Sequence, residues 1–293
     1  MEMIKIKVPA TSANIGSGFD CLGMAVSLFN EYTFEKAEDF LITGCPLEYS
    51  NKNNLVYTSY LKAFEACGKE SVMVHIHIKS EIPVSRGLGS SAACIVAGVL
   101  AANHFMGNCM NENEVFKLCS DLEGQPDNVA PALFGGVQAC FVEENAVYHN
   151  EFKLHDSYYL TVLIPPFELS TSESRAVLPK SIERKDAVYA MSHAIATLRY
   201  LENGEYDKLC LALRDCLHQP YRLPLIKDSD KVIQACHKFG GKIVYLSGAG
   251  PTLLCISKAN LSDLIADEIG LDWVIKSVTI VNTGALRGVE VYG

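Results

Sequence analysis

Pro83-Val84-Ser85-Arg86-Gly87-Leu88-Gly89-Ser90-Ser91-Ala92-Ala93 lies between an alternating, strand-like run (residues 72–78) and an apolar segment that continues to residue 102. This order predicts a strand, a glycine-rich turn and a helix, an arrangement that directs backbone N–H groups and a helix dipole toward one anion. The two glycines let a phosphate approach the main chain, and the two serines add hydroxyl groups beside it. The stretch therefore predicts a nucleotide phosphate loop, with a plain turn before a buried helix as the alternative.

Two other kinds of phosphate-binding loop fit the chain less well. The P-loop pattern is absent, because Gly68-Lys69 and Gly241-Lys242 lack the following Ser or Thr. Gly87-x-Gly89-x-x-Ala92 fits the looser dinucleotide pattern, which requires a second strand soon after the helix. Residues 111–123 instead predict another helix, so the sequence disfavours a dinucleotide fold.

The composition is that of an ordinary soluble globular protein. The 293 residues are 49% hydrophobic and 20% charged, which favours two lobes with substantial cores. A net charge of -9 disfavours non-specific nucleic-acid binding. Residues 1–5 do not resemble a signal peptide, and the unbroken apolar run, residues 92–102, is too short to cross a membrane. Eleven cysteines without regular spacing indicate free thiols, so we expect a cytoplasmic protein that binds neither membrane nor nucleic acid.

Two further polar segments of the first half can carry chemistry. Residues 9–20 form a small, glycine-containing loop between two predicted strands, with Asn14 and Asp20 as its reactive side chains. Residues 123–131 place two carboxylates and an amide on a proline-containing turn that can hold a metal and orient a hydroxyl group. The alternative for the second segment is a solvated turn in which Asp127 caps a short helix.

The second half predicts a separate lobe. The polar residues 150–157 mark the boundary, and a glycine-rich hairpin, residues 247–252, separates two apolar strands. Strands and helices alternate without βαβ regularity, which favours an α+β fold. The other elements predicted here are a strand at 159–164, helices at 169–178, 188–201, 206–217 and 261–270, and strands at 274–281 and 289–292.

In combination, these segments resemble the GHMP kinase superfamily, whose three motifs correspond in order to residues 9–20, 83–93 and 247–252. Within the superfamily, the chain is most similar to the homoserine kinase family. That similarity is carried by Pro9-Ala10-Thr11-Ser12-Ala13-Asn14-Ile15-Gly16, by Glu123-Gly124-Gln125-Pro126-Asp127-Asn128 and by Ser170-Thr171 with Arg175-Ala176-Val177-Leu178-Pro179. The resemblance covers nearly the full chain.

The resemblance implies a two-lobed α+β fold with the nucleotide between the lobes. Residues 1–155 would form a ribosomal-protein-S5-like α/β lobe with the ATP loop and the metal site. Residues 156–293 would form a ferredoxin-like α/β plait with the substrate arginines and the third motif, Gly248, Ala249 and Gly250. The implied activity is the ATP- and magnesium-dependent phosphorylation of L-homoserine to O-phospho-L-homoserine in threonine biosynthesis, by a homodimer.

The resemblance also implies roles for particular residues. The loop from Pro83 to Ala93 would wrap the ATP phosphates, Asn54 would meet the adenine, and Ser91 and Glu123 would hold magnesium. The residues implied to bind the acceptor are Asn14, Asp20, Gln125, Thr171, Arg175 and Arg222. This set suits a zwitterion, since the arginines can bind its carboxylate in a bidentate fork while the aspartate and asparagine face its ammonium group.

Asp127 and Asn128 would lie at the reacting hydroxyl. A carboxylate with its usual pKa of about 4 is a poor base for an alcohol, so the sequence favours orientation of the hydroxyl by Asp127 over proton abstraction. Gln125 departs from the family pattern, which commonly has histidine there. We therefore expect no inflection near pH 6.5 from this position.

Two alternatives remain open from the sequence. Another GHMP small-molecule kinase would share the ATP loop but would not need the pair Arg175 and Arg222. A non-catalytic ligand-binding relative would be expected to lose Glu123 or Ser91, and both are present.

Overall fold

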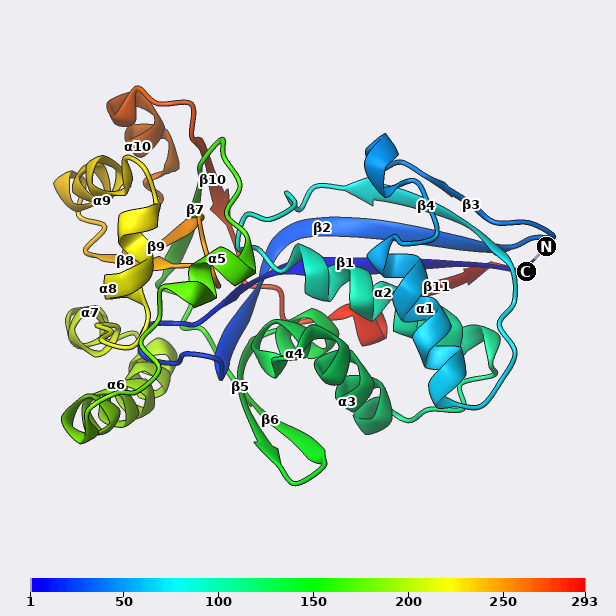
Figure 1. Ribbon diagram of the computed structural model, residues 1–293. Helices are drawn as coiled ribbons and strands as arrows, with labels where there is room; N and C mark the ends of the chain where they lie inside the picture. The colour runs from blue at the N-terminus through cyan, green and yellow to red at the C-terminus, as the bar shows by residue number, and fades with distance from the viewer. Residues whose placement is uncertain (1, 293) are drawn as a thin grey trace.

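A computed structural model describes residues 2–292 as two lobes, each built on its own β-sheet (Figure 1). The sheet of the first lobe has seven strands in the order β11-β1-β2-β4-β3, with β5 paired to both β2 and β6. The strands are β1 (Met3–Ala13), β2 (Leu22–Lys36), β3 (Leu41–Thr43), β4 (Val74–Ser80), β5 (Val137–Glu143), β6 (Ala146–Phe152) and β11 (Val289–Tyr292).

Strand β1 continues further than the sequence predicts. We expected a loop from Pro9, but the chain stays paired with β2 to Ala13, with a register shift between Pro9 and Ala10. Proline has no N–H to donate to the ladder, so such an irregularity is where a strand accommodates it. The loop between β1 and β2 is consequently short, and Asn14 and Asp20 lie at its two ends.

Helices α2 and α4 pack against the long strands of this lobe, α1 packs on α2, and α3 packs on α2 and α4 (Figure 1). Helix α2 is buried nearly all round, as its apolar sequence predicts, and Gly98 allows close approach to α1, because a Cβ there would lie 2.3 Å from the Val56 carbonyl oxygen. The helices are α1 (Leu55–Ala66), α2 (Ser90–Phe105), α3 (Glu112–Glu123) and α4 (Pro126–Phe134), with the short 3₁₀ helices η1 (Leu47–Tyr49) and η3 (Ala285–Arg287).

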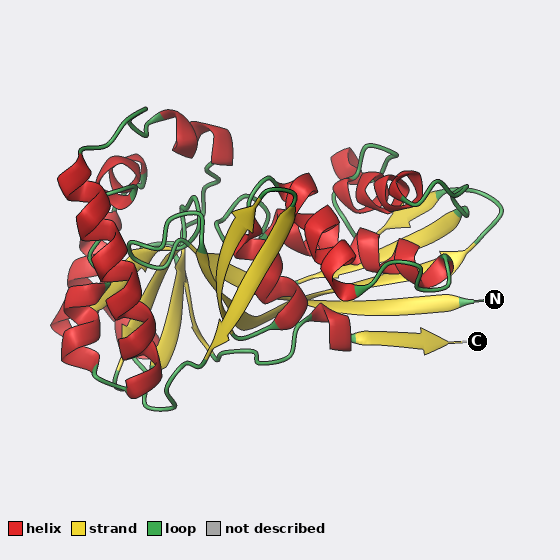
Figure 2. Ribbon diagram, turned by 90° about the horizontal axis from the view of Figure 1, so that it is seen from below, coloured by secondary structure: helices red, strands yellow, loops and turns green. Residues whose placement is uncertain are grey.

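The second lobe has a four-stranded antiparallel sheet in the order β10-β7-β9-β8, with helices beside it (Figure 2). The first strand of the lobe therefore lies between the fourth and the third, which confirms the predicted ferredoxin-like plait. Its elements are β7 (Tyr159–Ile164), α5 (Thr171–Ala176), α6 (Arg184–Asn203), α7 (Tyr206–Ala212), α8 (Gln219–Arg222), η2 (Leu223–Leu225), α9 (Ser229–Lys238), β8 (Ile243–Leu246), β9 (Leu253–Ser257), α10 (Ser262–Ile269) and β10 (Val274–Val278).

Two helix predictions are corrected. The helix predicted over 206–217 ends at Ala212, because the Asp215 carboxylate accepts hydrogen bonds from the N–H groups of residues 217–219 and begins α8 instead. The predicted turn after Glu123 is helix α4, with Pro126 at its first position, where the missing N–H has no cost. Asp127 lies inside that helix and does not cap it.

The last strand returns to the first lobe. Strand β11 pairs antiparallel with β1, from Met3 opposite Tyr292 to Ile6 opposite Val289. The division at residue 155 stays a prediction, and any such division must place residues 289–292 in the sheet of the first lobe. Within residues 2–292, no helix combines the length and apolar character needed to cross a bilayer.

Candidate active site

A cavity of about 390 Å³ is lined by residues of both lobes. It brings together most of the residues that the sequence selects, from seven separate segments of the chain. Those that line it are Asn14, Asp20, Asn54, Val84, Ser85, Arg86, Gly87, Gly89, Ser90, Ser91, Glu123, Gln125, Asp127, Asn128, Thr171, Arg175, Arg222, Gly248, Ala249 and Gly250. Pro83, Leu88, Ala92 and Ala93 do not, and the last three are fully buried in the core.

At two positions of the phosphate loop, the backbone has a conformation that favours glycine. Gly87 and Gly89 both have φ of 70°, and a Cβ on Gly89 would lie 1.9 Å from Thr11 Oγ1. Helix α2 begins directly behind this turn, so its first free N–H groups face the cavity side of the loop. Ser247 Oγ donates to the Gly87 carbonyl oxygen at 2.6 Å and thereby attaches the third motif to the loop.

Arg86 connects the phosphate loop to the second lobe. Its Nε donates to the Pro165 carbonyl oxygen at 3.2 Å and its Nη2 to that of Pro166 at 3.1 Å. Nη1 lies 3.3 Å from Glu168. The guanidinium is thus held by the chain after β7, although Arg86 also lines the cavity.

Ser91 and Glu123 lie together at the start of α2 and the end of α3. Ser91 Oγ donates to Glu123 Oε2 at 2.7 Å, and burial raises the pKa of Glu123 above its ordinary value. Among the described residues no cation pairs with this carboxylate. A hydroxyl and a carboxylate beside a phosphate loop are a donor set that Mg²⁺ accepts, since Mg²⁺ takes one or two protein ligands together with substrate phosphates.

Asp127 is 2% exposed, and no cation of residues 2–292 lies within hydrogen-bonding distance of its carboxyl group. Burial is the main cause that raises its pKa from 3.8 to about 7, with the charges of Asp20 and Glu123 adding to the shift. The sequence prediction that assigned this carboxyl its usual pKa is therefore wrong. Thr11 Oγ1 donates to Asn128 Oδ1 at 2.7 Å, and Asn128 Nδ2 lies 3.4 Å from Asp127 Oδ1.

Asp20 and Arg175 form a bidentate ion pair across the two lobes. Arg175 Nη1 and Nη2 donate to the two carboxylate oxygens of Asp20 at 3.1 and 2.8 Å. Asn14 and Asp20 both have left-handed backbones, with φ of 59° and 56°, and the Asp20 N–H donates to Asn14 Oδ1 at 2.8 Å. The geometry therefore presents an anion and a cation side by side at the cavity wall.

Arg222 is 1% exposed, the largest fully buried side chain of the described residues. Its Nε donates to the Ser174 carbonyl oxygen at 3.1 Å and its Nη1 lies 3.4 Å from that of Gly248. Burial, together with the nearby charge of Arg175, lowers the pKa of Arg222. A buried guanidinium with no carboxylate of the described residues on it is a strong attractor for an anion.

Asn54 is the N-cap of α1. Its Oδ1 accepts from the Val56 N–H at 2.9 Å and its Nδ2 donates to the Tyr49 carbonyl oxygen at 2.9 Å. The side chain that was expected to meet the adenine is thus engaged in the fold at the cavity wall. The sequence missed the other residues of this end of the cavity, which include Tyr32, Leu55, Ile78 and Cys94. These residues belong to no sequence motif, because a flat ring such as adenine can pack against many different apolar side chains.

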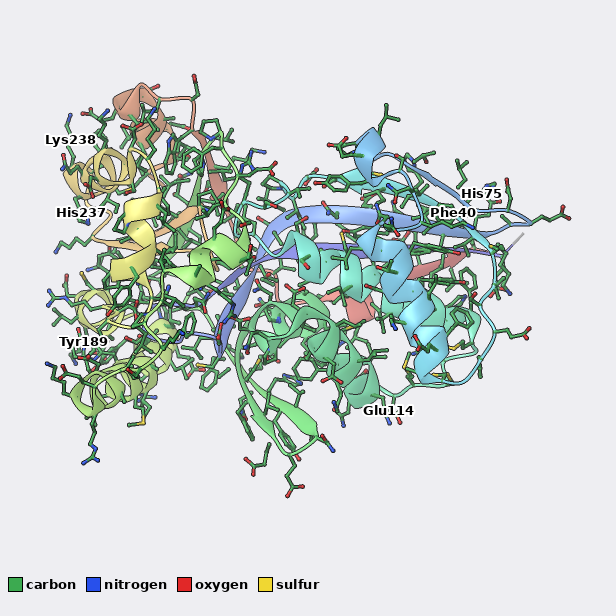
Figure 3. All side chains as sticks on the ribbon, in the orientation of Figure 1. Phe40, His75, Glu114, Tyr189, His237 and Lys238 are labelled. Carbon is green, nitrogen blue, oxygen red and sulfur yellow. The ribbon has the colours of Figure 1, made fainter. Side chains whose placement is uncertain are left out.

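No group of three or more potential metal-binding side chains (His, Cys, Asp or Glu) occurs in residues 2–292. His75 of β4 is labelled beside Phe40 in Figure 3, near the label of β3 in Figure 1. Its Nε2 lies 2.7 Å from Asp39. This histidine takes no part in the cavity.

Known families match both lobes. GHMP kinases N terminal domain is the family description that matches residues 54–136, and GHMP kinases C terminal matches residues 191–273. Fold and site together define a small-molecule kinase of the GHMP class. A homoserine kinase of Clostridium botulinum (strain Okra / Type B1) is 42% identical over 291 residues, covering 97% of this chain and 98% of that protein. The chain belongs to the homoserine kinase family.

Two further comparisons agree with this placement. A homoserine kinase of Clostridium beijerinckii is 40% identical over 291 residues, with 97% of this chain and 98% of that protein covered. The crystal structure of a homoserine kinase from Cytophaga hutchinsonii matches with a TM-score of 0.84 at 26% identity, covering 99% of this chain and 97% of that one.

Proposed function

We propose that the protein transfers the γ-phosphoryl group of ATP to the side-chain hydroxyl of L-homoserine and releases ADP and O-phospho-L-homoserine. The observation that carries this proposal is the cavity that joins the phosphate loop to the Asp20–Arg175 pair. The loop suits a polyphosphate. The pair suits a zwitterion, because an incoming amino acid can give its carboxylate to Arg175 and its ammonium group to Asp20.

Each of the two charged groups of the acceptor would bind side chains of its own, the carboxylate at one end and the ammonium group at the other. Its carboxylate would bind Arg175 and the buried guanidinium of Arg222, while Asn14 Oδ1 and the Asp20 carboxylate would receive the ammonium group. Thr171 and Gln125, both on the cavity wall, would complete the contacts with the acceptor. An exposed ion pair contributes little to stability. Breaking the Asp20–Arg175 pair so that each side chain can bind a charged group of the substrate therefore has a small cost in free energy.

We propose that Asp127 is the base that accepts the proton of the acceptor hydroxyl. A base whose pKa lies near 7 is matched to neutral pH, and this carboxyl is close to that value because it is buried. The hydroxyl oxygen would bond to the γ-phosphorus as its proton passes to Asp127 and ADP leaves. Asn128, held by Thr11, would keep Asp127 and the hydroxyl in line with the phosphate.

We further propose magnesium as the cofactor, held by Ser91 Oγ and Glu123. The charge of the half-buried Glu123, which no cation of the described residues compensates, supports this role. When bound, the metal would neutralise charge on the ATP phosphates. Family membership is also our basis for proposing a homodimer, which light scattering of the purified protein would test.

An ADP-release assay with homoserine, shikimate, mevalonate and galactose tests the proposed substrate. Turnover of homoserine should far exceed that of the other three, and a higher rate with any of them contradicts the proposal. Arg175→Ala should raise the KM for homoserine by about 100-fold, while the KM for ATP stays unchanged. Arg184→Ala removes another exposed helical arginine, outside the cavity, and should change neither constant.

A further inference from the structure

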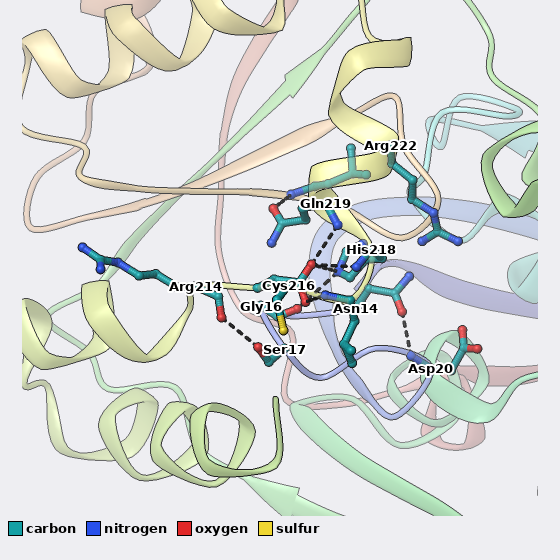
Figure 4. A network of polar contacts seen from close by, with 12 residues as sticks. Asn14, Gly16, Ser17, Asp20, Arg214, Cys216, His218, Gln219 and Arg222 are labelled. Atoms are coloured by element: carbon teal, nitrogen blue, oxygen red, sulfur yellow. Dashed lines mark hydrogen bonds and ion pairs between the residues drawn. The ribbon is translucent and has the colours of Figure 1, made fainter. Parts of the chain in front are cut away.

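His218 is a buried, titratable side chain to which neither the motifs nor the proposed reaction gives a role. It is fully buried, and its Nε2 donates to the Gly16 carbonyl oxygen at 3.2 Å. Nδ1 makes no hydrogen bond to any described residue. The same Nε2 lies 3.6 Å from Asp215 Oδ2, and its hydrogen bond goes to the middle of the loop between β1 and β2, as Figure 4 shows. This loop, residues 14–20, is called the acceptor loop below.

The acceptor loop needs support from outside. Asn14, Gly16 and Asp20 all have left-handed φ angles, between 56° and 59°, which cost free energy for residues other than glycine. The support comes from the chain before α8, because Ser17 Oγ donates to the Arg214 carbonyl oxygen at 2.7 Å. A Cβ on Gly16 would meet Leu213 at 2.7 Å, so the two segments touch directly.

The segment that carries His218 is itself rigidly held. The fully buried carboxylate of Asp215 accepts from the N–H groups of Leu217, His218 and Gln219 at 2.7 to 2.9 Å. Gln219 Oε1 accepts from the Leu246 N–H at 2.9 Å, which attaches α8 to β8. The imidazole thus projects from a backbone fixed to the second lobe, while its hydrogen-bond partner belongs to the first lobe.

Phe19 connects this support to the substrate arginines. Its ring stacks on His218 with centroids 5.4 Å apart at 27°. The guanidinium carbons of Arg222 and Arg175 lie 5.1 and 5.8 Å from the same ring. His218 is the N-cap of α8 and Arg222 is the last residue of this helix, and both side chains contact the ring of Phe19 in the acceptor loop.

We propose that His218 is a positioning residue that fixes the acceptor loop against α8, and so sets the distance between the groups facing the ammonium end and those facing the carboxylate end of the acceptor. The groups at the ammonium end are Asn14 and Asp20, and those at the carboxylate end are Arg175 and Arg222. This role rests on the proposed amino-acid substrate. His218 does not line the cavity, and its contacts are with the acceptor loop, so this role does not involve the ATP side of the cavity.

Steady-state kinetics of His218→Leu and His218→Gln test the role. Leucine keeps the apolar volume but removes the bond to Gly16, so the KM for homoserine should rise about tenfold or more, with the KM for ATP and kcat within about twofold. Glutamine can place an amide N–H near the position of Nε2 and should restore most of the affinity. Tyr158→Phe is the control, since it deletes a buried hydroxyl that donates to the Tyr200 carbonyl oxygen, away from the cavity.

The kinetic constants and the Tm of these variants distinguish a positioning role of His218 from a purely structural one. A lower Tm with both KM values and kcat shifted together, or no rescue by glutamine, overturns the proposal. If His218→Leu does not fold, Phe19→Leu decides, because it removes the stacked ring and leaves the Gly16 bond. The KM for homoserine should again rise alone, and an unchanged value overturns the proposal. Failure of the wild type to turn over homoserine would instead contradict the proposed function.

Discussion

Replacement of Asp127 by asparagine should stabilise the ligand-free protein, increasingly so as the pH rises. The carboxyl has a pKa of about 7 in the folded protein and 3.8 as its ordinary value. Since the folded-state pKa is the higher one, the folded protein binds this proton more tightly than the unfolded chain does. Stability therefore falls as the pH rises from about 4 to about 7, and is constant above that range.

The two pKa values give the magnitude. Integrated from pH 5 to pH 8, the loss of stability from this one carboxyl is about 2 to 3 kcal/mol. The amide that replaces the carboxyl does not titrate, so the free-energy difference between Asp127→Asn and the wild type should grow by that amount over the same interval. Differences in packing or hydrogen bonding between the two side chains do not depend on pH and cancel in this comparison.

Urea unfolding of both proteins at pH 5, 6, 7 and 8, without ATP or magnesium, measures the difference. Asp121→Asn is the matched control, because Asp121 is exposed on α3 beside Lys117, and its substitution should change the pH dependence by less than about 0.5 kcal/mol. Parallel pH dependences for the wild type and Asp127→Asn would refute the reasoning, since they would mean that this carboxyl titrates at its ordinary value in the folded protein.

Three further outcomes concern activity. The kcat/KM of the wild type should rise with pH through about 7, and Asp127→Asn should abolish that inflection and lower kcat/KM by at least about 100-fold; a loss of only about tenfold would point to orientation of the hydroxyl. Glu123→Gln should raise the magnesium concentration needed for half-maximal rate at least about tenfold in a metal titration, and an unchanged requirement would remove Glu123 from the metal site. Gly89→Ala should weaken ATP binding in calorimetry and lower the Tm, because its Cβ would lie 1.9 Å from Thr11 Oγ1 at a φ of 70°; wild-type affinity would contradict this account of the phosphate loop.

The pH dependence expected here differs from the one that the sequence suggests. Gln125 replaces a titratable histidine, so no inflection near neutrality was expected from that position. The structure supplies a different titrating group, Asp127, whose burial follows from helix α4 packing against β1 and β2. Burial is a tertiary property. Local sequence shows a carboxylate after a proline and gives no measure of how much water reaches it.

The sequence predicts well what depends on local pattern. The strand–turn–helix of the phosphate loop and the helix that begins after Ser170 both follow from residue type and spacing. It predicts poorly what depends on distant partners. A sequence separation of 155 residues between Asp20 and Arg175 hides their ion pair, and no spacing rule links His218 to Gly16.

Helix ends show the same limit. The apolar pattern after Tyr206 continues to Leu217, yet α7 ends at Ala212 because Asp215 captures the next backbone donors. The segment that follows α7 also touches the acceptor loop, because a Cβ on Gly16 would lie 2.7 Å from Leu213. A short segment with functional contacts on both sides therefore departs from its own periodicity.

The pairing of β11 with β1 has a consequence for how the molecule is assembled. The sheet of the first lobe needs residues 289–292, which the ribosome makes after the whole of the second lobe. During synthesis, the outer edge of β1 stays open, and its unpaired backbone groups are available to other chains. The first lobe can therefore be completed only after the second lobe has been synthesised, and a fragment ending near residue 155 should aggregate through that edge unless a peptide spanning residues 285–292 is supplied.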